Sequence, residues 1–282
     1  MDFSDVLLTV DFDRTLTAPD STIPQRNLEA IEYFMANGGA FTVNTGRSIP
    51  MYSSQKDRVN VNVPLLLYNG SAAVTADDQL VNAVAIPTDP RAMIEDIQSR
   101  FPDLAVELQG KRHHYLFRKD EMWENYCDNN GCPWAYASLE DIPMPFLKLA
   151  LYEKFTANTV AAMYQATPAQ LAYFDEVEAY VNTRYAGLVE VFRAAPRIID
   201  IHAKGVSKGA IARWLQKDLG RKILVCVGDA ENDLAMLREA DYAFCPRDGI
   251  LAKDFPNVCE CGKGAVADVI YEKIPEILGV QP

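Results

Sequence analysis

Three aspartates lie just after apolar segments of this sequence, where turn residues would be expected, and one lysine lies at the start of a helical pattern. Asp11 and Asp13 directly follow an apolar run near the start, Asp229 follows a second apolar run, and Lys208 begins a stretch with helical spacing. Like charges this close repel one another, but carboxylate oxygens are the ligands that a hard divalent cation prefers. These residue types therefore indicate a divalent metal site with a positive charge beside it.

The polar residues belong to four short stretches, and each stretch lies at the end of a predicted strand or the start of a predicted helix. They are "DFDRT" at 11–15, "TGR" at 45–47, "SKG" at 207–209 and "GDAEND" at 228–233. In an open parallel sheet, ligands bind outside the carboxyl ends of the strands. Each stretch is a weak signal alone, but their common placement favours one shared site.

Apolar strands alternating with helices predict the elements that position these residues. The predicted strands are almost continuously apolar, and they cover residues 6–12, 40–46, 63–70 and 222–228. Amphipathic helical spacing follows at 24–39 and again at 207–220, where Gly38 and Gly220 end the pattern. Strands of this kind separated by helices are typical of a parallel sheet covered on both faces. We predict an α/β fold.

The middle of the chain has a different, mixed α+β pattern. Helical spacing is expected at 90–101 and 158–171, and alternating strand-like stretches are expected at 113–119, 146–152 and 178–184. We therefore predict two domains, one of them discontinuous. The core is assigned to 1–83 and 188–282, and the inserted α+β domain to 84–187.

Composition excludes several classes of protein. The 282 residues carry a net charge of −12, which disfavours binding to nucleic acid or to anionic membranes. No apolar run reaches the length of a membrane span, and the N-terminal residues lack the positive charge of a signal peptide, so we expect a cytoplasmic protein. The six cysteines contain no Cys-x-x-Cys pair and the three histidines have no helical metal spacing. Reduced thiols are expected rather than a zinc or disulfide framework.

The four stretches also resemble a known family. "DFDRT", "NTGRS", "GVSKG" and "GDAENDLAML" are similar, in this order, to the four motifs of the haloacid dehalogenase (HAD) superfamily. Within it, the chain resembles the Cof-type, class IIB-capped magnesium-dependent phosphatases. The likeness covers residues 5–80 and 195–270, whereas the middle matches only in length, position and coarse pattern. It implies a Rossmann-like parallel-sheet core and an inserted α+β cap domain that sets substrate specificity.

The resemblance also implies roles for individual residues. Asp11 would be the nucleophile that forms an aspartyl-phosphate, Asp13 the general acid and base, and Lys208 the cation for the phosphoryl oxygens. Mg²⁺ would be held by side-chain oxygens of Asp11 and Asp229 and by the backbone carbonyl of Asp13. Asp233 is expected to orient the metal's waters or Lys208 rather than to bind the metal directly.

Four further residues are candidates for substrate binding: Thr45, Gly46, Arg47 and Asn232. The hydroxyl and the backbone amide of Thr45 are expected to hold a phosphoryl oxygen, whereas Arg47 could equally shape the loop at the strand end. Many relatives have glycine where Arg14 stands, so Arg14 either adds phosphate affinity or points outward.

The expected activity is hydrolysis of a phosphate monoester of a small phosphorylated metabolite, with a sugar phosphate as the first candidate. A phosphomutase and a catalytically silent phosphate-ligand-binding module are the alternatives, and a monomer and a homodimer are both compatible with the sequence. Two features stay open. The basic stretch "KRHHYLFRK" at 111–119 either reaches the substrate or forms the solvated edge of a sheet, and "CPRDG" leaves the role of Asp248 undefined.

Overall fold

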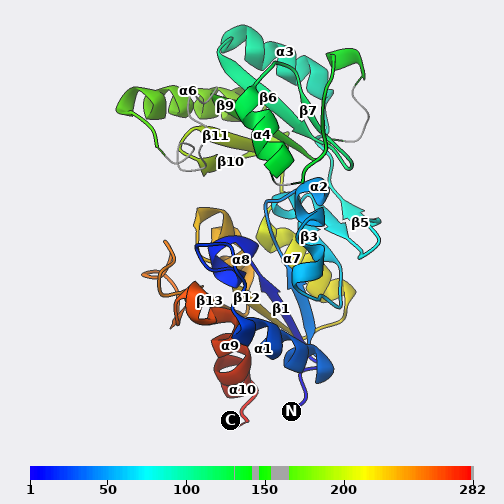
Figure 1. Ribbon diagram of the computed structural model, residues 1–282, viewed down its shortest axis with the longest axis vertical. Coiled ribbons are helices and arrows are strands. Elements are labelled where there is room, and N and C mark those ends of the chain that lie inside the picture. The colour runs from blue at the N-terminus through cyan, green and yellow to red at the C-terminus, as the bar shows by residue number, and fades with distance from the viewer. Residues whose placement is uncertain (130, 142–145, 154–164, 281–282) are drawn as a thin grey trace. The chain divides into compact units, whose positions relative to one another are not determined.

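The computed structural model of the chain describes residues 1–129, 131–141, 146–153 and 165–280 (Figure 1). The chain forms two compact units, which we call the first and the second unit. The first unit comprises Met1–Gly46, Lys56–Asn82 and Ser207–Pro282. The second unit comprises Arg47–Gln55 and Ala83–Val206. Within the described ranges, no helix combines the length and the apolar character needed to cross a lipid bilayer.

A five-stranded parallel sheet in the order β14-β13-β12-β1-β2 is the centre of the first unit. Its strands are β1 (Val6–Val10), β2 (Ala40–Val43), β12 (Ile223–Val227), β13 (Tyr242–Pro246) and β14 (Asn257–Val258). Every residue of β1 and β2 is buried, as expected for strands that are covered on both faces. The predicted α/β fold with a Rossmann-like parallel sheet is confirmed.

Helices cover both faces of this sheet (Figure 1). They are α1 (Gln25–Ala36), α7 (Lys208–Asp218), α8 (Leu234–Glu239), α9 (Ala265–Asp268) and α10 (Ile274–Ile277). Leu7 and Cys226 belong to the same buried cluster as the apolar side chains of α7 and α8. Because side chains alternate along a strand, Val6, Leu8 and Val10 point to the other face, where α1 and α9 pack together.

The register of the parallel sheet brings three strand ends to the same edge. Val10 at the end of β1 is paired with Val227 of β12 and with Val43 of β2. The residues that follow these strands, beginning with Asp11, therefore leave the sheet side by side. This is the edge at which the sequence predicts a site.

A smaller sheet of the first unit follows β2. It has the order β3-β4-β5, with β3 (Leu65–Leu67), β4 (Ala72–Val74) and β5 (Leu80–Ala83). A parallel bridge between Asn44 and Leu66 connects it to the end of β2. The tight turn Tyr68–Gly70 joins β3 to β4, and Tyr68, Asn69 and Gly70 all have positive φ.

The second unit contains a six-stranded sheet in the order β10-β11-β9-β6-β7-β8. Its strands are β6 (Leu104–Gln109), β7 (His114–Leu116), β8 (Trp134–Tyr136), β9 (Lys148–Glu153), β10 (Val189–Ala195) and β11 (Ile198–Ala203). Side chains of α3 (Pro90–Arg100) and α6 (Pro168–Arg184) fill one apolar core against it. A second cluster holds α4 (Glu121–Asn129) and Met51 of α2 (Ile49–Ser53).

The limits of the second unit differ from the predicted insertion of 84–187. Strands β10 and β11 form an antiparallel pair, and β11 also pairs with β9, so residues 188–206 belong to this sheet rather than to the core. The segment Arg47–Gln55 also groups with the second unit. Backbone pairing of the β10–β11 hairpin overrides the boundary that composition suggested.

One local prediction in the middle of the chain is wrong, and one of the two alternatives for 111–119 is excluded. Residues 178–184 are the end of helix α6 rather than a strand, because Phe174, Val177 and Val181 lie buried on one helical face and Thr167 and Gln170 form a capping box at its start. Strand β7, within 111–119, lies between β6 and β8, so it is not the edge of a sheet. Half of the helix predicted at 158–171 falls on 158–164, outside the described residues, and in the described half helix α6 begins at Pro168.

Candidate active site

Asp11 occupies the first position after β1. Its backbone amide donates to the carbonyl of Val227, 2.9 Å away, which ties it to the end of β12. The chain then turns back at once, because the amide of Leu16 donates to the carbonyl of Asp11. Asp11 is only 5% exposed. The sharp turn after a buried strand therefore holds a carboxylate at the sheet edge and largely away from water.

Asp11 is one member of a compact cluster of charged side chains from three places in the sequence. Carboxylate oxygens of Asp11, Asp229 and Asp233 lie within 4.8 Å of one another, and all three residues are buried. The Lys208 Nζ lies 2.6 Å from Asp11 Oδ1 and 2.6 Å from Asp233 Oδ1. When all are ionised, three negative charges face one positive charge, so a divalent cation would bring the sum to zero.

Asp233 acts as a brace inside this cluster. Its Oδ2 accepts hydrogen bonds from the amides of Asp229 (3.0 Å) and Ala230 (3.2 Å), while its Oδ1 accepts from Lys208. Gly228 makes room for it, because a Cβ at this position would lie 2.6 Å from the Cβ of Asp233. These contacts give Asp233 the position expected of a residue that orients Lys208.

Two acids of the cluster, Asp11 and Asp229, hold protons more tightly than acids in water. Burial raises the pKa of Asp11 well above its ordinary value, and the negative charge of Asp233 raises it further against the opposing effect of Lys208. Burial and Asp233 also raise the pKa of Asp229 to about 6, although Thr15 Oγ1 donates to its Oδ1 at 3.1 Å and favours the ionised form. A bound cation would supply positive charge that stabilises the ionised carboxylates.

Lys208 is held rigidly at the start of α7. Ser207 caps this helix by accepting from the amide of Ala210 at 3.0 Å, and Asn44 Nδ2 donates to the carbonyl of Lys208 at 2.9 Å. Burial favours the neutral amine, but the carboxylates of Asp11 and Asp233 outweigh it and keep the pKa of Lys208 above its ordinary value. The lysine is therefore charged throughout the neutral pH range.

Thr45 and Gly46 follow β2 at the same edge of the sheet. The Thr45 amide donates to the carbonyl of Leu66 at 2.9 Å, and its carbonyl accepts from the amide of Asn69 at 3.1 Å. The expectation that this amide holds a phosphoryl oxygen is therefore wrong, which leaves the hydroxyl as the candidate donor. A Cβ on Gly46 would lie 2.6 Å from Asn69 Oδ1, so a side chain is not accommodated there without a shift. Arg47 groups with the second unit.

Gly70 connects this turn to the start of α7. It has φ +103°, and a Cβ at this position would lie 2.2 Å from the backbone carbonyl oxygen of Ser207. We expect Gly70→Ala to lower the free energy of unfolding by about 2–4 kcal/mol, because left-handed strain and a backbone clash add. The displaced Lys208 should also reduce activity.

Urea unfolding of both variants tests this, with Gly220→Ala as the control. Gly220 has φ +63° but open space around it. Gly220→Ala should therefore lower the free energy of unfolding by only about 1 kcal/mol, because the conformational penalty is its only cost. Equal losses of stability in the two variants would contradict the proposed close approach of Gly70 to Ser207.

Three other predicted residues lie at the margin of the cluster. Asp13 is exposed, and its charge is one of those that raise the pKa of Asp11. Arg14 is exposed at φ 63°, a backbone region that favours glycine. Its charge nevertheless lowers the pKa of Asp229. Asn232 is half-buried in the short turn Glu231–Asp233.

Sequence reasoning gave no role to two residues that support the site. Thr15 contacts Asp229 and Asn44 anchors Lys208, and the only sequence signal for either is its place within a motif stretch. Asp248 has a different task. It accepts from the amide of Cys261 at 2.9 Å and from the Cys261 Sγ at 3.1 Å, so it braces the loops after β13.

The chain is similar to known proteins over most of its length. A family model described as haloacid dehalogenase-like hydrolase matches residues 8–250. A protein of Buchnera aphidicola subsp. Schizaphis graminum that carries the name phosphatase is 22% identical over 233 residues, covering 82% of this chain and 80% of its own length.

Solved structures are similar over almost the whole chain. A haloacid dehalogenase-like hydrolase from Bacteroides thetaiotaomicron superposes with a TM-score of 0.77 at 19% identity and covers 95% of this chain and 98% of its own. A HAD subclass IIB sugar phosphatase superposes with a TM-score of 0.74 at 19% identity and covers 98% of this chain and 99% of its own. At such identities the likeness establishes the fold.

Proposed function

Because the chain belongs to the haloacid dehalogenase-like hydrolases and is a phosphatase of that family, we propose that it hydrolyses phosphate monoesters with Mg²⁺ through an aspartyl-phosphate on Asp11. The observation that carries the proposal is the buried cluster of Asp11, Asp229 and Asp233 around Lys208. Its donors are oxygens, which suit Mg²⁺, and its lysine offers a charge to an anionic substrate.

Asp11 is the proposed nucleophile. Its Oδ1 accepts from Lys208, so we assign the attack on phosphorus to Oδ2. The bond from phosphorus to the ester oxygen breaks, and the leaving alcohol takes a proton from Asp13. A water then attacks the phosphorus of the aspartyl-phosphate and gives a proton to Asp13, which releases inorganic phosphate and regenerates the Asp11 carboxylate. The exposure of Asp13 suits a group that exchanges protons with solvent.

The remaining groups position the phosphoryl group. Side-chain oxygens of Asp11 and Asp229 and the carbonyl of Asp13 would hold Mg²⁺, which when bound neutralises charge on the transferring phosphoryl oxygens. Lys208 stabilises a second oxygen, and Thr45 and Gly46 contribute at the end of β2. Asn232, on the turn beside Asp229, is a proposed phosphate contact.

The second unit is proposed to select the substrate, as a cap. A sugar phosphate is the first candidate, because the structural neighbour of subclass IIB with a named activity is a sugar phosphatase. That neighbour is 19% identical to this chain, so the substrate among small phosphorylated metabolites is to be identified by experiment.

A panel of phosphate esters tests the proposal, with release of inorganic phosphate as the readout. The wild-type chain should release phosphate with Mg²⁺ and lose this activity when the metal is removed with EDTA. Transfer of phosphate between positions of a sugar without net release would identify a phosphomutase. Ligand binding without any turnover across the panel would identify a silent binding module and overturn the proposal.

Mg²⁺ affinity should depend on pH, because the metal competes with protons for the same oxygens. The pKa of Asp229 is raised to about 6 and that of Asp11 is also raised, so at least one of them carries a proton in the metal-free site below about pH 6. We expect the apparent affinity to fall about tenfold or more per pH unit below pH 6, where Asp229 takes up a proton. Calorimetric titrations with Mg²⁺ at several pH values measure this.

The same pKa shift has a consequence for stability. An acid whose folded pKa lies above its unfolded pKa stabilises the fold at low pH, and this contribution is lost as pH rises through the folded pKa. The metal-free chain should therefore lose stability from this site as pH rises through about 6, and Mg²⁺ should restore it. A pH-independent Mg²⁺ affinity between about pH 5 and 7 would contradict the assignment of these acids as ligands.

A further inference from the structure

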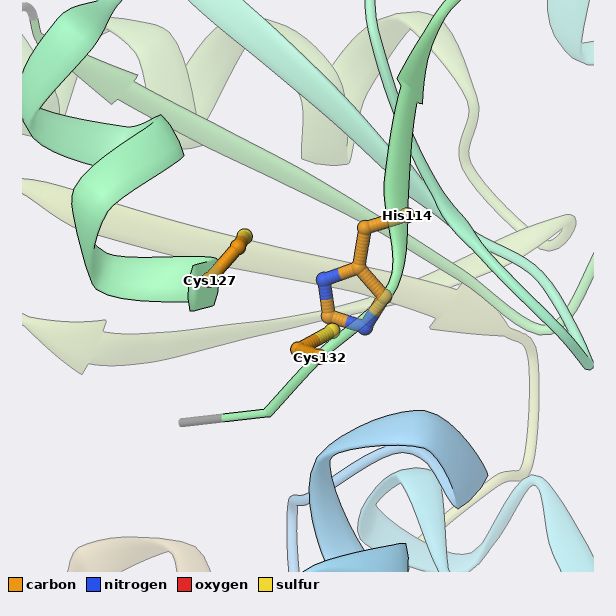
Figure 2. Close-up of side chains that lie close together, drawn as sticks. All are labelled: His114, Cys127 and Cys132. Atoms are coloured by element: carbon orange, nitrogen blue, oxygen red, sulfur yellow. The ribbon is translucent and has the colours of Figure 1, made fainter. Parts of the chain in front are cut away.

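A second cluster of potential metal ligands lies wholly inside the second unit. A ring nitrogen of His114 and the Sγ atoms of Cys127 and Cys132 lie within 4.8 Å of one another, and all three residues are buried. Figure 2 shows the side chains of Cys127 and Cys132 beside the imidazole of His114 on β7, with Cys127 projecting from α4 and Cys132 from the chain that follows this helix. Sequence spacing gave no sign of this convergence.

Backbone pairing explains why these distant residues meet. Strand β7 pairs in parallel with β8, with His114 opposite Trp134, and the amide of His114 donates to the carbonyl of Pro133 at 2.9 Å. The amide of Cys132 donates to the carbonyl of Cys127 at 2.8 Å, so the chain leaving α4 doubles back. The positions of the three side chains are thus set by the sheet and by a closed turn.

His114 is oriented by hydrogen bonds at both ring nitrogens. Nδ1 lies 2.5 Å from Glu107 Oε1, and Nε2 lies 2.7 Å from Ser48 Oγ. Glu107 is itself fixed by Trp123 Nε1 and by Gln109 Nε2, each at 2.9 Å. A histidine that binds metal through one nitrogen almost always gives the other to a carboxylate or a similar partner. The surroundings of His114 have this form.

The order Ser48, His114, Glu107 also has the connectivity of a hydrolytic triad. These residues are 0%, 1% and 0% exposed, respectively. Ser48 Oγ also accepts from the amide of Met51 as the cap of α2. A nucleophile closed to substrate on every side has no hydrolytic use, so the array supports structure rather than catalysis.

We propose that His114, Cys127 and Cys132 bind a zinc ion. Two sulfurs and one imidazole nitrogen form a ligand set that suits Zn²⁺ far better than Mg²⁺. With bonds of about 2.0–2.3 Å, tetrahedral ligands lie roughly 3.3–3.8 Å apart, so separations of up to 4.8 Å need a contraction of at most about 1.5 Å. Both thiol protons leave to solvent on binding, and the ring binds through a deprotonated nitrogen.

The role of Glu107 depends on which ring nitrogen of His114 binds the ion. Binding at Nδ1 would displace the hydrogen bond to Glu107 and bring its carboxylate to the ion. Binding at Nε2 would displace Ser48 and keep Glu107 as the partner of the other nitrogen. In either case Glu107 supports the ion, and the ion would join β7 to the chain that follows α4.

Cobalt substitution tests the site on the full-length, reduced and chelator-treated chain. Co²⁺ alone should produce a sulfur-to-cobalt charge-transfer band, because only thiolate ligands give one, and Zn²⁺ should then abolish it at about one equivalent per chain. The carboxylate cluster of Asp11 can bind Co²⁺ but cannot give this band. Cys127→Ser combined with Cys132→Ser should remove the band, whereas Cys259→Ser, at a half-buried thiol of the first unit, should keep it.

A second measurement addresses Glu107. Glu107→Gln should weaken Zn²⁺ binding about 10- to 100-fold, the usual effect of losing a partner of a ligating histidine. Glu153→Gln, on β9 of the same sheet, should leave the affinity unchanged. Near-ultraviolet circular dichroism checks that each variant is folded. The measurement on the wild-type chain does not depend on the folding of any variant. The absence of a sulfur-to-cobalt band in the reduced wild-type chain would overturn the proposal.

Discussion

Asp11→Asn is expected to lower kcat by about a millionfold, the size of loss seen when the nucleophile of a covalent hydrolase is removed. The amide keeps the shape of the carboxylate but cannot form the aspartyl-phosphate. The variant should remain folded, because burial and the neighbouring acids already raise the pKa of Asp11. A neutral side chain therefore removes a charge that the metal-free fold disfavours. Initial rates on the best ester of the panel measure the effect.

Asp241→Asn provides the matched control for this experiment. Asp241 also belongs to the first unit, but its Oδ2 accepts from the amide of Leu224, at the beginning of β12 rather than at its end. Its loss should reduce stability and leave kcat almost unchanged. Wild-type transfer of phosphate to Asp11 should be visible as a phosphorylated peptide by mass spectrometry. An Asp11→Asn enzyme that works at the wild-type rate would end the nucleophile assignment.

Lys208→Met should combine a large loss of stability with a large loss of rate. The amine is fully enclosed and bridges Asp11 and Asp233 at 2.6 Å each, so its removal leaves two buried carboxylates without their cation. Breaking a buried ion pair in this way costs about 3–5 kcal/mol. The loss of one preorganised charge at the phosphoryl oxygens should lower kcat about 100- to 1000-fold. Urea unfolding and initial rates measure the two effects separately.

Mg²⁺ should return part of the stability that Lys208→Met loses, because it supplies positive charge to the same acids. Lys222→Met is the control. Lys222 pairs with Asp5 at 2.9 Å, but its side chain is 74% exposed, so its removal should cost less than about 1 kcal/mol. Equal destabilisation by the two substitutions would show that Lys208 is not the charge on which the cluster depends.

The sequence predicted the part of the site that depends on strand order. Asp11, Thr45 and Asp229 each follow an apolar strand, and parallel strands place such residues at one edge regardless of their distance along the chain. The roles of these residues stay predictions until the variants are measured. The hydrogen bonding of Thr45 was missed, because its amide is used by Leu66, a partner whose approach depends on the small β3 sheet rather than on the motif.

The second unit could be predicted less well, because its elements depend on long-range pairing. The hairpin of β10 and β11 joins β9 across a long stretch of chain, and composition alone does not mark that border. His114 and Cys132 meet through the pairing of β7 with β8, which no local spacing reveals. The helical spacing of Phe174, Val177 and Val181 indicates the helix, but the alternating pattern at 178–184 led to the prediction of a strand.

The pairing of Val10 with Val227 has a consequence for the order in which the molecule can be made. Strand β1 leaves the ribosome before β12, and this neighbour is synthesised more than two hundred residues later. At usual rates of translation this is a wait of roughly 10–40 s. During that time one edge of β1 has no strand paired with it. The metal site cannot form until β12 has been synthesised.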